Sequence, residues 1–309
     1  MNFYTFSFNK INKIFLVFLI LFIGGISAKI FNDLQYYFKH QNTLKYLSSR
    51  YNYNSINAKI DDYLPLIYEH NKCFRYKLDS GYNDYLENGC LQIKNIKKPI
   101  VFLIGDSHSA SIGMAMGKYY KNNNINFLQI SSGWCTPFTN NIDNRECLRI
   151  NKLIDQTIIT TQPDILIISV SWIGASKPPY NIKNSNFFKN VYEKLEQYKY
   201  LGAKQIILIG QLPVWSKMIP EIFNLSLELD RINTSEVSTE IIDFDKVMLK
   251  FSKDNNISYI ALIPDLCMRN ECRITEPFTN NLIAWDESHL TEEGSYFIFT
   301  NYLVNKIKF

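Results

Sequence analysis

The chain has 309 residues, of which 46% are hydrophobic, and its 33 lysines and arginines exceed its 29 aspartates and glutamates by four. This hydrophobic content is enough to bury a globular core, which excludes a largely disordered chain. The small net charge and the scattered basic residues exclude a nucleic-acid-binding protein as well.

An apolar stretch, IFLVFLILFIGGISA (residues 14–28), comes after two lysines and carries no charged side chain. With the next three residues it lies in length between a signal-peptide core and a minimal membrane span, and either would export the rest of the chain. Ala28 permits cleavage, but the long apolar run favours an uncleaved, single-pass transmembrane signal-anchor at residues 14–31 of the inner membrane. The lysines then predict residues 1–13 as a cytoplasmic tail and the remainder as periplasmic.

Residues 32–71 are polar and rich in tyrosine and asparagine, with weak helical periodicity. We expect a stalk that leads from the membrane to a catalytic domain at residues 72–309. His40 and His70 lie in this stalk without a partner motif and are predicted to be ordinary surface residues.

The six cysteines fall into three pairs that are close in sequence. The predicted disulfides are Cys73 with Cys90, Cys135 with Cys147, and Cys267 with Cys272. An exported chain folds in an oxidising compartment, where each disulfide contributes about 2–4 kcal/mol of stability. Reduced, buried cysteines are the alternative. No Cys-x2-Cys-like spacing with a nearby histidine occurs, so no metal site is predicted.

From Pro99 onward, apolar runs alternate with segments of helical spacing. The runs are IVFLIG, NFLQIS, DILIISVSW, QIILIGQ and SYIALIP, and the helical segments include residues 186–202 and 291–307. Because these runs are continuously apolar, both faces of the sheet must be covered, which is typical of parallel strands between two helical layers. The predicted fold class is therefore a three-layer α/β/α sandwich with a mainly parallel sheet, preceded by one N-terminal transmembrane helix.

The first apolar run ends in Gly-Asp-Ser-His, which places Asp106, Ser107 and His108 at the carboxyl end of a strand. Ligands of open α/β sheets bind at this edge. A serine on a tight strand-to-helix turn is exposed and lies beside backbone N–H groups, which suits a nucleophile with an oxyanion site. The alternative is a serine or aspartate that caps the start of a helix.

A serine hydroxyl becomes a nucleophile only when a base takes its proton, so a histidine oriented by a carboxylate is needed. The stretch IAWDESHLTEEG (residues 283–294) places Asp286 three residues before His289. In a turn, this spacing lets the carboxylate reach the imidazole Nδ1–H and leaves Nε2 free. A surface turn is the alternative for this pattern alone. Asp265 is interpreted as a solvated strand end rather than a triad member.

IGDSHSA and WDESHLTEEG together resemble the SGNH (GDSL-type) hydrolase superfamily, and in particular the periplasmic SGNH domains associated with acyltransferase-3 family membrane acyltransferases. The stretch SSGWCTP (residues 131–137), with its paired cysteine, fits the loop after the second strand of such domains. The resemblance covers residues 73–309.

The resemblance implies a role for each matching residue. Ser107 would be the nucleophile, His289 the general base and then acid, and Asp286 the carboxylate that orients the imidazole. The backbone N–H groups of Ser107 and Gly133 would donate to the oxyanion. No cofactor is predicted.

The chain departs from the superfamily in its third block. Gly-x-Asn normally supplies an asparagine donor there, but SVSWIGAS (residues 169–176) has none. The similar fused domains often have a tryptophan there, so the resemblance implies that Trp172 lines the pocket. The loss of one oxyanion donor typically costs about 2.7–4 kcal/mol. Adjacent side chains on a tight turn diverge, so His108 is predicted to line the pocket wall or make a structural hydrogen bond, and Asp106 to bind backbone N–H groups.

The apolar stretch predicts a membrane-anchored, extracytoplasmic protein, and the resemblance implies a serine acyl-ester enzyme that moves acetyl onto a cell-surface carbohydrate through acyl-Ser107. Its predicted partners are an acyl donor, a carbohydrate acceptor and a separate multi-span membrane acyltransferase. A free-standing carbohydrate esterase and a non-catalytic carbohydrate-binding protein of the same fold are the alternatives.

Overall fold

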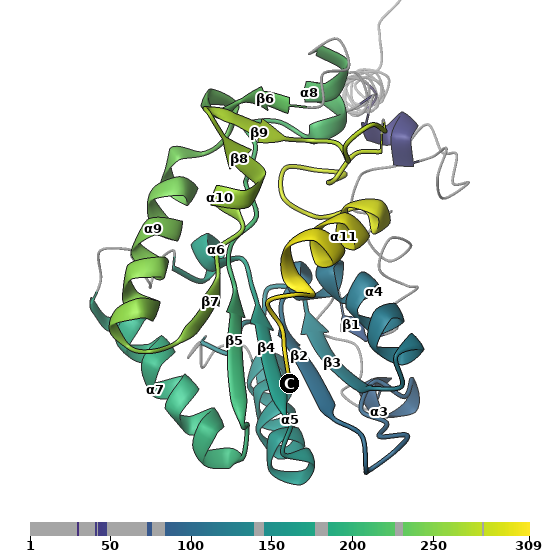
Figure 1. The fold of residues 1–309 in the computed structure, drawn as a ribbon, viewed down its shortest axis with the longest axis vertical. Helices are drawn as coiled ribbons and strands as arrows, with labels where there is room; N and C mark the ends of the chain where they lie inside the picture. The colour runs from purple at the N-terminus through teal and green to yellow at the C-terminus, as the bar shows by residue number, and fades with distance from the viewer. Residues whose placement is uncertain are drawn as a thin grey trace, which may run out of the picture.

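The computed structural model (Figure 1) describes most of the chain after residue 83 and a few segments before it. The described residues are 30, 41, 43–47, 73–75, 84–138, 145–176, 185–225, 231–279 and 281–309. The predicted anchor up to residue 29, His40 and His70 lie outside them. In this part of the chain, no helix is both long and apolar enough to span a membrane.

A parallel sheet of six strands forms the centre of the fold, in the order β1-β3-β2-β4-β5-β7. The strands are β1 (Phe74–Arg75), β2 (Ile100–Gly105), β3 (Asn126–Ser132), β4 (Ile165–Ser169), β5 (Gln205–Ile209) and β7 (Ser258–Ile260). Every neighbouring pair is parallel, as the continuous apolar runs predict. The carboxyl ends of β2, β3 and β4 therefore meet at one edge of the sheet.

Helices cover both faces of this sheet (Figure 1). Because side chains alternate along a strand, Phe102 and Ile104 of β2 pack on one face and Val101 and Leu103 on the other. The first face carries α5 (Arg145–Thr161), α7 (Ser185–Leu201) and α9 (Thr239–Asp254), and the second carries α4 (Ser107–Asn122) and α11 (Glu292–Ile298). The three-layer α/β/α prediction is confirmed.

The C-terminal part of the domain differs in detail from the prediction. The helix expected over residues 291–307 is α11 followed by a π-helical turn at Phe299–Leu303. The run SYIALIP divides into β7 and the short helix α10 (Ile263–Leu266), because Pro264 removes a backbone donor and fits the first turn of a helix.

Shorter elements complete the fold. They are α3 (Asp84–Glu87), α6 (Trp172–Ser176), α8 (Ile219–Leu225), the 3-10 turn Thr234–Glu236, and the strands β6 (Arg231–Asn233), β8 (Cys267–Met268) and β9 (Glu271–Arg273). The last three strands form a small antiparallel sheet in the order β6-β9-β8, which the sequence analysis does not predict.

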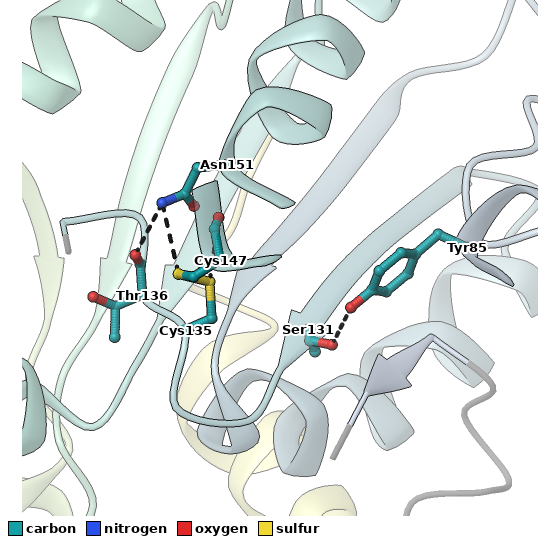
Figure 2. The surroundings of a disulfide bond; sticks show 6 residues. All are labelled: Tyr85, Ser131, Cys135, Thr136, Cys147 and Asn151. Atoms are coloured by element: carbon teal, nitrogen blue, oxygen red, sulfur yellow. Dashed lines mark hydrogen bonds between the residues drawn. A yellow bond between two sulfur atoms is a disulfide. The ribbon is translucent and has the colours of Figure 1, made fainter. Parts of the chain in front are cut away.

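All three predicted cysteine pairs are disulfides in the structure. Cys135–Cys147 joins the loop after β3 to the start of α5, where the Asn151 side chain donates to the carbonyl of Thr136 at 3.3 Å (Figure 2). The Tyr85 hydroxyl donates to the carbonyl of Ser131 at 2.8 Å on the same edge (Figure 2). The end of β3 is thus held by Tyr85, and the loop after it by the disulfide and Asn151.

Candidate active site

Ser107 is the first residue of α4 and directly follows the turn that ends β2. Asp106 caps the helix, and its side chain accepts the N–H of His108 at 2.9 Å. The turn is tight because Gly105 has φ +148°, and a Cβ at this position would lie 1.8 Å from the carbonyl oxygen of Ser169. Only glycine fits where the ends of β2 and β4 approach this closely.

The structure brings Ser107, His289 and Asp286 together from opposite ends of the domain. The Ser107 Oγ lies 2.8 Å from His289 Nε2, and His289 Nδ1 lies 2.6 Å from Asp286 Oδ2. The other carboxylate oxygen accepts the backbone N–H groups of Ser288 at 2.8 Å and His289 at 2.6 Å. These contacts are what the Asp-x-x-His spacing predicts for a turn, and Nε2 faces the serine.

Electrostatics around this trio favour an imidazole that can take a proton. Burial disfavours the charged form of Asp286, but His289 and the hydrogen bonds to the carboxylate outweigh it, so the pKa of Asp286 is lowered. Burial also opposes a charge on His289, yet Asp286 outweighs it and raises the pKa of His289. A proton taken by Nε2 would therefore be stabilised by the carboxylate behind the ring.

Two aromatic rings flank the imidazole of His289. The ring of His108 lies 4.9 Å away between centroids, and the ring of Trp285 stacks on it at 5.7 Å with an interplanar angle of 15°. Burial, together with the nearby charge of His289, lowers the pKa of His108 to about 3. The imidazole of His108 is therefore uncharged and packs beside the ring of His289. Trp285 is not among the predicted site residues, although its position next to Asp286 in the same motif could have indicated it.

Asp106 joins the Ser107 turn to the next strand. Besides the N–H of His108, its carboxylate accepts the backbone N–H of Ser171, which comes after β4, at 2.8 Å. Burial raises the pKa of Asp106 to about 6, although these hydrogen bonds and the charge of His289 act in the opposite direction. The expected contacts with backbone N–H groups are present, and they extend across two strands.

Two residues predicted for the pocket lie in other surroundings. The N–H of Gly133 donates to the carbonyl of Arg75 at 2.7 Å, because β1 continues its pairing past the end of β3. Trp172 is fully buried, donates its indole N–H to the carbonyl of Ile209 at 2.7 Å and stacks on Phe138. As a correction, Trp172 lies beneath the edge of the sheet rather than on an open pocket wall.

Two further observations bear on the predictions. As a correction, Asp265 lies in the first turn of α10 rather than at a strand end, and its carboxylate pairs with Lys306 at 2.8 Å. Among the described residues, no group of three or more histidine, cysteine or acidic side chains is arranged to hold a metal ion.

Comparison with known proteins gives the family. The model of the SGNH domain fused to AT3 domains matches residues 72–302. No curated protein sequence matches the chain.

Among solved structures, the periplasmic domain of a lipopolysaccharide acetyltransferase from Salmonella ser. Paratyphi A is similar, with a TM-score of 0.68 and 20% identity over 84% of this chain and 96% of that one. A GDSL-like lipase from Bacteroides thetaiotaomicron VPI-5482 has a TM-score of 0.47 and 14% identity over 73% of this chain and 96% of its own. Est24, a carbohydrate acetylesterase from Sinorhizobium meliloti, has a TM-score of 0.44 and 11% identity over 68% and 97%. Because the family model matches most of this chain, the chain belongs to the family of SGNH domains that occur fused to AT3 domains.

Proposed function

We propose that the chain is an extracytoplasmic serine enzyme that transfers an acetyl group onto a cell-surface carbohydrate through an acyl-Ser107 intermediate. The observation that carries this proposal is the pair of contacts at His289, 2.8 Å from Ser107 Oγ and 2.6 Å from Asp286 Oδ2. A base within hydrogen-bond reach of a serine, itself oriented by a carboxylate, is the arrangement that activates a hydroxyl nucleophile.

The reaction would run in two symmetrical halves. As Ser107 Oγ bonds to the acyl carbon, its proton passes to His289 Nε2 and the carbonyl electron pair moves onto the carbonyl oxygen. Collapse of this intermediate breaks the bond to the donor group, which leaves with the proton from His289. A sugar hydroxyl then gives its proton to His289 and attacks acyl-Ser107, and the second collapse returns the proton to Ser107. Water in place of the sugar gives hydrolysis.

The family and the fold support the choice of substrates. The family is described as SGNH domains fused to AT3 domains, and the Salmonella domain belongs to a lipopolysaccharide acetyltransferase. We infer acetyl as the acyl group and a carbohydrate of the cell envelope as the acceptor. A separate multi-span AT3-type membrane protein is the proposed source of the acyl group.

The proposed location is outside the cytoplasm. Three disulfides suit an oxidising compartment, and the matching Salmonella domain is periplasmic. We propose that residues 14–31 anchor the chain in the inner membrane, with residues 1–13 in the cytoplasm and residues 32–71 as the stalk of the domain at 72–309.

The proposal is tested with the full chain in detergent, isotope-labelled p-nitrophenyl acetate as donor and a panel of envelope oligosaccharides as acceptors. Labelled acetyl on a sugar, absent with Ser107→Ala, is the expected result. Ser107-dependent release of acetate with no labelled sugar would instead identify an esterase. A chain that neither turns over the donor nor reacts with a serine-directed phosphonate would contradict catalysis and favour a carbohydrate-binding protein.

A further inference from the structure

The end of β4 carries a serine in the place where the superfamily's asparagine donor is expected. Gly105 and Ser169 are register partners at the ends of β2 and β4. Ser107 and Ser171 each come two residues later, so they occupy equivalent positions just past the ends of two adjacent parallel strands. This register places Ser171 beside the Ser107 turn, while the neighbouring Trp172 is directed into the core.

Hydrogen bonds fix Ser171 against that turn. Its backbone N–H donates to Asp106 Oδ2 at 2.8 Å, and the other oxygen of the same carboxylate accepts the N–H of His108. The residues directly before and after Ser107 are thus joined to Ser171 through a single side chain. Ser171 is therefore held against the turn that carries the nucleophile.

The hydroxyl of Ser171 has a proton available for a ligand. Its Oγ accepts the N–H of Gly174 at 3.3 Å, as the cap of the short helix α6. Among the described residues, this hydroxyl donates to no acceptor, and the side chain is half-buried rather than enclosed. One lone pair is therefore used and the O–H remains free to donate.

We propose that the Ser171 hydroxyl donates a hydrogen bond to the oxyanion of the tetrahedral intermediate on Ser107, in place of the missing asparagine amide. This inference rests on the proposed function. When Ser107 Oγ bonds to the acyl carbon and its proton moves to His289, the carbonyl oxygen gains a full charge. Ser171 stabilises that charge without itself gaining or losing a proton.

Gln211, which follows the neighbouring strand β5, also has an unused side-chain donor. It is 1% exposed, its Oε1 accepts the N–H of Ile173 at 3.3 Å, and its buried Nε2 has no hydrogen-bond partner. Gln211 comes after β5, one strand farther from β2, and it touches α6 rather than the Ser107 turn. It is therefore a positioning residue for α6. As the alternative oxyanion donor, it is compared with Ser171 in the test below.

The test measures kcat and KM for p-nitrophenyl acetate with the full chain in detergent. Ser171→Ala should lower kcat on the order of 10²-fold with little change in KM, since the hydrogen bond forms only as charge develops. Ser171→Thr and Ser171→Asn, which restore a donor, should recover most of the loss. Ser176→Ala is the matched control, because its hydroxyl bonds the carbonyl of Ile173 within the same short helix.

A second variant moves the hydroxyl without removing it. A Cβ on the exposed Gly174 would lie 2.9 Å from Ser171 Oγ, so Gly174→Ala should displace the hydroxyl and lower kcat by an intermediate factor. A boronic acid that forms a tetrahedral anion on Ser107 should lose affinity for Ser171→Ala by a factor similar to the loss in kcat. A purely structural role of Ser171 would not link these two quantities.

The outcomes separate the inference from the proposed function. Ser107-dependent turnover that is unchanged in Ser171→Ala, or that falls in Gln211→Met alone, would overturn the inference and leave the proposed function in place. Absence of Ser107-dependent turnover in the wild-type chain would overturn both.

Discussion

Asp286 and His289 are held by contacts inside one short loop, whereas Ser107 and Ser171 are brought together by the pairing of two strands. In the loop, the carboxylate bonds the ring and the backbone of a residue three positions away. At the sheet edge, the register of Gly105 with Ser169 and one bond to Asp106 set the geometry. The first side of the site depends on local spacing, and the second on which strands are neighbours.

The largest effect is expected from Ser107→Ala, which removes the atom shared by both sides. Loss of the nucleophile should lower kcat for p-nitrophenyl acetate on the order of 10⁶-fold, down to the background rate. Ser111→Ala is the matched control, because this hydroxyl of the same helix bonds only the carbonyl of His108. Equal activity in the wild type and Ser107→Ala would refute the assignment.

Asp286→Asn removes the carboxylate that orients His289 and leaves the Ser107 turn intact. It should lower kcat on the order of 10⁴-fold. The carboxylate raises the pKa of His289, and the base must be neutral to accept the serine proton. Activity therefore rises with pH through the pKa of His289. Removal of the carboxylate should move this acidic limb of the kcat/KM profile to lower pH. A limb that stays in place would show that another group controls the titration.

Gly105→Ala and Gly294→Ala test the two sides by crowding the backbone. A Cβ at Gly105 would lie 1.8 Å from the carbonyl oxygen of Ser169, and one at Gly294 would lie 1.9 Å from that of Ile283. Each should cost more than about 3 kcal/mol of unfolding free energy in urea titrations. Gly117→Ala is the control, since its nearest neighbour is a flexible ring at 3.4 Å. Equal stability of all three variants would contradict the close approach.

The smallest effect on activity is expected from loss of the disulfide at the far side of the β3 loop. The double variant Cys135→Ser/Cys147→Ser should lower the free energy of unfolding by about 2–4 kcal/mol, measured by denaturant titration. Its kcat should change less than about tenfold, because the contacts that hold Ser107 and His289 do not involve this disulfide. A larger loss of kcat with unchanged stability would show that the loop contributes directly to catalysis.

The sequence predicts the features that depend on short-range patterns. Continuous apolar runs require a covered parallel sheet, and the spacing of Asp286 and His289 fits a turn in which the carboxylate binds the ring. The disulfides are predictable because the cysteines of each pair are close in sequence. The small antiparallel sheet escapes prediction because its three short strands have no clear alternation of side chains.

The surroundings of Trp172 and Gly133 could not be predicted from local sequence patterns. The family resemblance places Trp172 in the pocket. The direction of its side chain depends on the strand register and on an acceptor for the indole N–H, which Ile209 provides. Gly133 is expected to donate to the substrate, yet its N–H is used by Arg75 because β1 is its neighbour. Both outcomes depend on strand order, which no local motif encodes.

The acyl-Ser107 intermediate can be trapped when the full chain is mixed with p-nitrophenyl acetate, quenched in acid and digested for mass spectrometry. We expect acetyl on Ser107 in the peptide that spans the end of β2, accumulating in the absence of a sugar acceptor and disappearing when an acceptor is added. Turnover of the ester with Ser107 unmodified at every time point would contradict it.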